Sequence, residues 1–297
     1  MLRRTLPLFA LLVAAAPAPA AAQPAPPKTI LFVGNSFTYG DAAGGPELVR
    51  PFGAGTVTDL NGTGVGGVPA LFKRFTTEAG LNYVVSVETA PGVGLDYHYE
   101  HKLALLNRPW DVVVLQSYST LDAAKPGDPA TLVAYAARLA DTLSARNAAV
   151  VIHLVATWSR ADQTYLPRGH WFGRPIDAME QEVAAGYEAA GARSPRIRDV
   201  IPVGAAWDRA IRTGFADANP YDGIDGGKVD LWAPDGYHAS VYGYYLEALV
   251  EFGAVTGVDP STLGEREAAA PALGITPAQA AALQAVAHDQ LATRPAR

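Results

Sequence analysis

Three residue types that together can perform nucleophilic catalysis stand near the two ends of the chain. Ser36 follows an apolar run that ends at Gly34, whereas Asp235 and His238 stand three positions apart near the C-terminal end. A serine hydroxyl is a poor nucleophile until a neighbouring base takes its proton, and imidazole titrates near neutral pH. A carboxylate on the other ring nitrogen fixes the tautomer and stabilises the imidazolium. The chain therefore contains a complete set of parts for nucleophilic catalysis by a serine.

These residues also have ordinary structural explanations. Ser36 is suited to cap the N-terminus of a helix after the turn. Asp235 follows Pro234 just before a predicted helix, where an aspartate caps free backbone N–H groups well. The combination favours catalysis, because each of the three side chains supplies what the other two need.

A parallel sheet is predicted to position these side chains. Five segments rich in Val, Ile and Leu are predicted as buried strands, at residues 29–34, 83–90, 111–116, 149–156 and 199–203. Helical segments are predicted at residues 71–79, 97–107, 130–145, 179–190 and 239–256, and Thr276 is predicted to cap another helix that begins at Pro277. Alternating strands and helices indicate a parallel sheet covered on both faces. Ligands and catalytic groups collect at the carboxyl ends of such strands.

Two long connections rich in glycine and proline interrupt this pattern, at residues 41–67 and 214–232. Long irregular connections in a compact domain are more often functional than accidental. We therefore expect both to border the active site.

The N-terminal residues are typical of an export signal. Arg3 and Arg4 precede a short apolar stretch, and small residues follow it at a predicted cleavage site. We predict a signal peptide at residues 1–22, a Pro-rich leader at residues 23–28 and a single domain at residues 29–297. The apolar stretch is too short to span a bilayer, so no membrane anchor is expected and the predicted location is periplasmic or secreted.

Composition excludes several classes of function. The 297-residue chain has no cysteine, which excludes thiol catalysis, disulfides and zinc–thiolate sites. Its net charge is −6 and it has no basic cluster, which argues against nucleic acid and anionic membranes as partners. Hydrophobic residues make up 49% of the chain, enough for a core that needs no disulfides.

Two blocks carry a resemblance to a known family. Gly-Asn-Ser-Phe at residues 34–37 resembles the first block of the SGNH (GDSL-like) hydrolases, and Asp-Gly-Tyr-His at residues 235–238 resembles their C-terminal block. The resemblance covers nearly the whole chain after the predicted signal peptide. It implies a flavodoxin-like three-layer α/β/α sandwich with a five-stranded parallel sheet in the order 2-1-3-4-5. It also implies Ser36 as nucleophile, His238 as general base and Asp235 as its partner.

The resemblance further implies an oxyanion hole, and here the match is looser. The family uses the serine N–H, a glycine N–H after the second strand and an asparagine side chain after the third. Gln116 stands in place of the asparagine, with the same amide on a chain longer by one methylene. Its alternative role is a buried amide that holds a loop. Gly92 is preferred to Gly67 because it follows the second predicted strand, although either could be an ordinary turn glycine.

Residues after the fourth predicted strand should reach the same rim as Ser36. Trp158 could stack on a sugar or an acyl group, and Arg160 could pair with an anion. A plain surface role for both stays open.

Two further histidines could imitate a metal site. His98 and His101 are three apart on a predicted helix, close to acidic residues, but no third convergent ligand is evident. We expect their side chains to be solvated, whereas His153 lies within an apolar strand and is expected to be a hydrogen-bonded core residue.

The sequence thus predicts an exported serine esterase that acts through an acyl-enzyme on a small-molecule or glycan ester. A carbohydrate O-acetyl ester is the first substrate to consider, and no metal or organic cofactor is required. Two alternatives stay open, an O-acyltransferase with the same triad and a catalytically silent glycan-binding module. The residues favour no particular oligomeric state.

Overall fold

The structure is a computed structural model that describes residue 2 and residues 26–294. The predicted signal peptide, apart from residue 2, and the predicted cleavage site lie outside the described residues. Six parallel strands form one sheet in the order β2-β3-β1-β4-β5-β6. The strands are β1 (Lys28–Gly34), β2 (Thr58–Asp59), β3 (Tyr83–Thr89), β4 (Val112–Leu115), β5 (Val151–Ala156) and β6 (Ile197–Pro202).

The sheet confirms the predicted fold class with one added strand. The five predicted strands are β1, β3, β4, β5 and β6, and they lie in the predicted order. The sixth strand, β2, is a two-residue edge strand that pairs with β3. It lies inside a connection that was predicted to be irregular, and two residues are too few to show a strand pattern.

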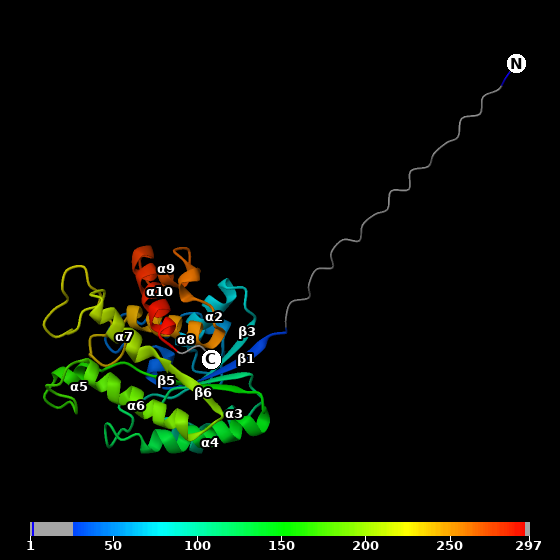
Figure 1. Ribbon diagram of the computed structural model, residues 1–297, viewed down its shortest axis with the longest axis horizontal. Helices are drawn as coiled ribbons and strands as arrows, with labels where there is room; N and C mark the ends of the chain where they lie inside the picture. The colour runs from blue at the N-terminus through cyan, green and yellow to red at the C-terminus, as the bar shows by residue number, and fades with distance from the viewer. Residues whose placement is uncertain (1, 3–25, 295–297) are drawn as a thin grey trace.

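Helices cover both faces of the sheet, as Figure 1 shows. On one face lie α2 (Gly67–Glu78), α7 (Val203–Arg212), α8 (Val241–Thr256), α9 (Ala269–Ala272) and α10 (Pro277–Ala292). On the other lie α3 (Leu95–Leu106), α4 (Ala130–Arg146) and α6 (Asp177–Arg193). Short helical segments are α1 (Ser36–Tyr39), α5 (Ala161–Tyr165), η1 (Ala54–Thr56) and η2 (Pro260–Leu263). No helix in the described part of the chain is long and apolar enough to cross a membrane.

The central strand β1 shows why a continuous apolar run forms a strand here. Ile30 and Phe32 face the layer that contains α8, whereas Leu31 and Val33 face the layer that contains α4. Successive side chains of a strand point to opposite faces, so a strand covered on both sides must be apolar at every position.

The predicted cap at the last long helix is confirmed. Thr276 accepts a hydrogen bond from the backbone N–H of Gln279, whose side chain in turn accepts from the Thr276 N–H. Pro277 occupies the first turn, where its missing N–H costs no hydrogen bond.

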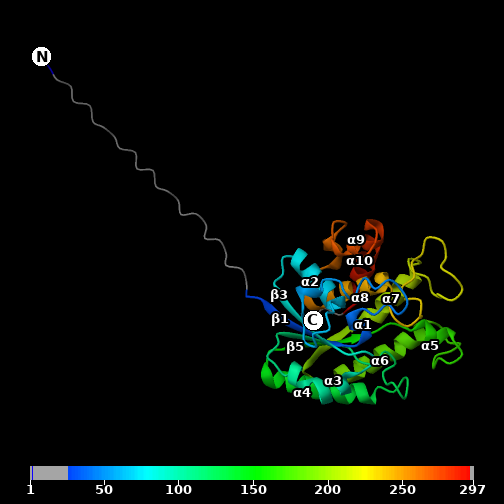
Figure 2. The same cartoon turned by 180° about the vertical axis from the view of Figure 1, so that it is seen from behind.

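The sheet topology places its switch point beside β1. The chain passes from β1 to β3 on one side and then to β4 on the other. Open α/β sheets bind ligands at the carboxyl ends of the strands beside such a reversal. Helix α1 begins at that end of β1, toward the end of the molecule where α5 and the loop after α7 project (Figure 2).

Helix α8 buries two carboxyl groups one turn apart. Glu247 is 1% exposed and Glu251 is 3% exposed. Burial raises the pKa of Glu251 to about 8, and burial followed by the charge of Glu251 raises the pKa of Glu247 well above its usual value. Within the described residues, both carboxyl oxygens of Glu247 lack a hydrogen-bond partner. Both groups are therefore protonated in the folded protein at acidic and near-neutral pH.

These carboxyl groups predict a pH-dependent stability. Near pH 4 both folded and unfolded states hold the protons, but the unfolded state releases them as the pH rises while the folded state retains them up to about pH 8. The free energy of unfolding should therefore fall with rising pH, by up to about 1.4 kcal/mol per pH unit for each group. Urea unfolding of Glu251→Gln should show a shallower fall between pH 5 and pH 8 than the wild type.

A matched control is Glu265→Gln, which changes an exposed carboxylate. Its stability profile should keep the wild-type slope. An unchanged slope in Glu251→Gln would contradict the assignment of a buried, protonated carboxyl group.

Candidate active site

The turn after β1 leaves no room for a side chain at Gly34. A Cβ atom there would lie 2.1 Å from Thr38 Oγ1 and 2.7 Å from Gln116 Oε1. Such distances are far shorter than van der Waals contact, so the position requires glycine. The close approach lets the chain turn directly from the strand into α1, and Ser36 becomes the first residue of that helix.

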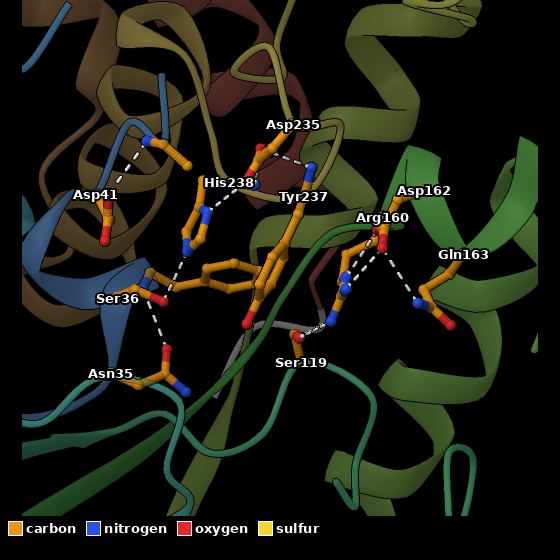
Figure 3. A network of polar contacts seen from close by, with 12 residues as sticks. Asn35, Ser36, Asp41, Ser119, Arg160, Asp162, Gln163, Asp235, Tyr237 and His238 are labelled. Carbon is orange, nitrogen blue, oxygen red and sulfur yellow. Dashed lines mark hydrogen bonds and ion pairs between the residues drawn. The ribbon is translucent and has the colours of Figure 1, made fainter. Parts of the chain in front are cut away.

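The structure brings the three predicted catalytic residues together (Figure 3). Ser36 Oγ lies 2.9 Å from His238 Nε2, and His238 Nδ1 lies 2.7 Å from Asp235 Oδ2. Ser36 is 202 positions away from His238 in the sequence. Hydroxyl, imidazole and carboxylate thus form a continuous hydrogen-bonded chain in the order that nucleophile activation requires.

Both oxygens of the Asp235 carboxylate are held. Oδ1 accepts hydrogen bonds of 3.0 Å from the backbone N–H groups of Tyr237 and His238, while Oδ2 receives the imidazole. Burial alone would raise the pKa of Asp235, but the bonds from His238 and from these N–H groups outweigh it, so the pKa lies below its usual value. Ser240, and not Asp235, caps the following helix α8. Asp235 is therefore ionised and fixed toward His238.

A buried tyrosine of α8 contacts the backbone at Ser36. The Tyr244 hydroxyl donates to the backbone carbonyls of Asp41, at 2.6 Å, and Ser36, at 3.3 Å. Burial raises the pKa of Tyr244 well above its usual value, so the hydroxyl keeps its proton. Tyr244 of helix α8 thereby holds the first residue of α1 and the loop just after that helix.

The Gln116 amide lies against the nucleophile turn. Its Oε1 accepts hydrogen bonds from the Asn35 N–H, at 2.9 Å, and from the Thr38 hydroxyl, at 3.3 Å. Its Nε2 donates to the carbonyl of Ser117. The side chain is 1% exposed. These contacts match the alternative role of an amide that holds a loop, and the oxyanion role of Gln116 stays a prediction.

Asn35 has a positioning role that the sequence analysis did not assign. Its Oδ1 accepts from the Phe37 N–H, while its Nδ2 donates to the carbonyls of Val93 and Ser117. One side chain thus caps α1 and ties together the loops that follow β3 and β4. The signal was present in the sequence, because asparagine is among the preferred N-cap residues.

Gly92 lies in the loop between β3 and α3, as predicted. Its φ of +68° is a left-handed conformation that glycine adopts without strain. Beside it lies a pocket of about 160 Å³, which has a mostly polar lining. The lining residues are Asn35, Gly92, Tyr118, Ser119, Thr120, Ala123, Arg160 and Tyr237. The predicted oxyanion glycine and the nucleophile turn thus border one small cavity.

The predicted rim position of Trp158 is wrong. Its ring is fully buried and stacked between Phe37, with centroids 4.1 Å apart, and Trp207, with centroids 4.4 Å apart. Its Nε1 donates to the backbone carbonyl of Tyr237 at 3.2 Å. Trp158 does follow the fourth predicted strand, but neighbouring aromatic rings cover both of its faces. It packs in the interior against Phe37 and is not available for stacking on a substrate.

Arg160 does reach the site. It borders the pocket described above, and its Cζ lies 3.5 Å from the centroid of the Tyr237 ring. Its guanidinium is paired with the carboxylate of Asp162, which reduces the attraction that it offers to an anionic substrate.

His98 and His153 are both buried and hydrogen-bonded to carboxylates, whereas His101 is exposed, as expected. His98 is fully buried, with Nδ1 2.5 Å from Glu88 Oε2, which corrects the expected solvated position. The sequence could not show this, because Glu88 lies on a different element, at the end of β3. His153 is the expected core residue, with Nδ1 2.6 Å from Asp199 Oδ1.

Comparisons with solved structures identify the fold of the chain. No protein-family model matches the chain, and no curated protein matches it. A DUF4886 family protein from Bacteroides uniformis superposes with a TM-score of 0.60 at 17% identity, over 90% of this chain and 96% of that protein. A protein assigned as a GDSL-like lipase from Parabacteroides merdae superposes with a TM-score of 0.51 at 17% identity, over 77% of this chain and 95% of that protein. The chain has the fold of the SGNH hydrolases.

The buried position of Trp158 in this SGNH-type fold predicts a structural effect of its removal. Trp158→Ala should lower the free energy of unfolding by roughly 3–5 kcal/mol, because a large side chain stacked on two rings leaves a cavity. Urea unfolding measures the loss. Phe172→Ala, at a side chain that is 52% exposed, should change stability by less than about 0.5 kcal/mol. A near-neutral Trp158→Ala with weakened sugar binding would restore the rim hypothesis.

Proposed function

We propose that the protein is an exported serine esterase that works through a covalent acyl-enzyme. The observation that carries the proposal is the hydrogen-bonded chain from Ser36 through His238 to Asp235. The SGNH-type fold supports it, since the structurally similar protein from Parabacteroides merdae is assigned as a GDSL-like lipase.

The geometry suits a two-step reaction. Ser36 Oγ attacks the ester carbonyl while His238 Nε2 takes its proton, and the imidazolium then protonates the leaving alcohol. In the second step His238 takes a proton from the water that attacks the acyl-enzyme, and the imidazolium then returns a proton to Ser36 Oγ as the acid leaves. Asp235 stabilises the imidazolium in both steps, because both of its oxygens are already held toward the His238 loop.

The oxyanion is assigned to backbone N–H groups beside the nucleophile. Ser36 is the first residue of α1, and the first N–H groups of a helix have no partner within it. The Asn35 side chain caps the next N–H, that of Phe37, which leaves the Ser36 N–H for the oxyanion. Gly92 borders the small cavity that Asn35, the residue before the nucleophile, also lines, and it is the proposed second donor.

The pocket favours a short acyl group. A volume of about 160 Å³ is well below the roughly 300–1,000 Å³ of pockets that hold drug-sized ligands. The hydroxyl and guanidinium groups that line the pocket make it polar, which disfavours a long alkyl chain. An acetyl ester of a carbohydrate is therefore the proposed substrate class.

The triad predicts the outcome of three substitutions. Ser36→Ala and His238→Ala should each reduce kcat on p-nitrophenyl acetate by about 10³-fold or more, and Asp235→Asn by a comparable factor. Ser261→Ala, in the remote segment η2, is the matched serine control and should retain full activity. Turnover that survives in Ser36→Ala would exclude this serine as the nucleophile.

The pocket predicts a preference for short acyl chains. Expressed from residue 23 onward, the protein should hydrolyse p-nitrophenyl acetate with a kcat/KM at least about tenfold above that for the octanoate, because a small polar pocket cannot bury the longer chain. A series from acetate to octanoate measures this. A rise of kcat/KM with chain length would instead indicate a lipase.

A further inference from the structure

The ring of Tyr237 lies between the catalytic imidazole and a guanidinium, as Figure 3 shows. The ring centroids of Tyr237 and His238 are 4.1 Å apart with an angle of 32° between the planes. On the other side, Arg160 Cζ lies 3.5 Å from the Tyr237 centroid. A cation at this distance from an aromatic face is attracted by the ring quadrupole. The tyrosine ring is thus packed between the guanidinium and the imidazole.

Arg160 is itself held in place by Asp162. Its Nε donates to Oδ1 at 2.9 Å, its Nη2 donates to Oδ2 at 2.7 Å, and its Nη1 donates to the Ser119 hydroxyl at 3.3 Å. The Arg160 side chain is 14% exposed and that of Asp162 is 8% exposed. The Asp162 backbone N–H also donates to the carbonyl of Gly236 at 3.0 Å. This pair thus contacts both the ring and the backbone of the loop that carries the catalytic acid and base.

We propose that Arg160 and Asp162 are a positioning pair for His238, acting through Tyr237. The kinetic tests of this inference rest on the proposed esterase function. The pair fixes the plane of the imidazole, and its two opposite charges set the electrostatic environment in which the imidazolium forms. Tyr237 transmits the contact, since its ring touches both the guanidinium and the imidazole.

The two charges act on the imidazolium with opposite sign. The guanidinium faces His238 across one ring and disfavours a second cation, whereas the carboxylate beyond it favours one at a longer distance. Other groups around the imidazole stay the same when this pair is changed. They are Asp235 in its own loop, Asp41 in the loop after α1, the protonated Tyr244 on α8, and Tyr221, whose hydroxyl lies 3.5 Å from the Asp235 carbonyl oxygen.

The test is the pH profile of kcat/KM on p-nitrophenyl acetate for Arg160→Met and Asp162→Asn. Activity requires a neutral imidazole, so kcat/KM rises with pH through an acid limb. The limb should move to higher pH in Arg160→Met and to lower pH in Asp162→Asn, by about half a pH unit or more in each case. Both variants should lose roughly tenfold in kcat with little change in KM, because the imidazole is less well oriented.

Two further variants sharpen the comparison. Arg160→Lys keeps the charge but loses the planar, two-bond contact with Asp162, so it should restore the wild-type acid limb without restoring full kcat. Arg196→Met removes an exposed ion pair with Asp141 elsewhere in the molecule, and should leave kcat and the pH profile unchanged.

A second readout does not depend on turnover. NMR titration of the imidazole in the Ser36→Ala background follows His238 directly, and its signal is identified by comparison with a His238→Asn variant. Titration midpoints that move in opposite directions in Arg160→Met and Asp162→Asn support the positioning pair even where the wild type turns over no ester. Shifted midpoints without any ester turnover would contradict only the esterase proposal.

Three results would overturn the inference. Midpoints that stay at the wild-type value in both variants would show that the pair does not act on His238. A shift in the same direction in both variants, together with lost stability, would indicate a merely structural ion pair. A rise in KM alone in Arg160→Met would assign Arg160 to substrate binding.

Discussion

The close approach at the end of β1 is the constraint on which the rest of the site depends. A side chain at Gly34 would overlap the Thr38 hydroxyl and the Gln116 amide, so only glycine lets strand β1, helix α1 and the end of β4 converge there. Convergence leaves the Asn35 N–H in a buried position, where an unpaired donor would cost free energy. The Gln116 Oε1 accepts from it. The position of Ser36 thus depends on the close packing of two side chains against Gly34 and on the Gln116 amide that pairs with the Asn35 N–H.

Aromatic packing connects the turn at Ser36 with the loop that carries Asp235 and His238. Phe37, next to the nucleophile, stacks on Trp158, and Trp158 stacks in turn on Trp207 of α7. The same indole donates its N–H to the carbonyl of Tyr237, in the loop that carries Asp235 and His238. One buried ring therefore contacts both segments that must meet, and a displacement of either segment would disturb its packing. This explains why a tryptophan at the end of β5 is buried instead of facing a substrate.

The sequence predicts those features that depend on neighbours along the chain. Apolar runs predict the five main strands, and the capping signature at Thr276 predicts the start of α10, because both patterns are local. The types of Ser36, Asp235 and His238 predict a triad, and the structure places these three side chains in hydrogen-bond contact. The errors concern burial, which is decided by contacts between distant segments. His98 is buried because Glu88 on β3 pairs with it, and Trp158 because Phe37 and Trp207 cover it. None of these three partners is marked by spacing in the sequence.

Within the triad, too, one contact is local in the sequence and the other joins distant segments. The spacing of Asp235 and His238 makes their pairing a local property, since the carboxylate binds two backbone N–H groups of its own turn with one oxygen and the imidazole with the other. With both oxygens held, the carboxylate cannot rotate away, and the imidazole keeps its hydrogen bond to Oδ2. The 2.9 Å contact with Ser36 is different, because it depends on where the whole loop lies. That location is set by the Trp158 indole and by the Arg160 guanidinium against Tyr237, two long side chains from the end of β5. The chemistry of the site is therefore encoded locally, whereas its assembly depends on a strand that contributes no catalytic group.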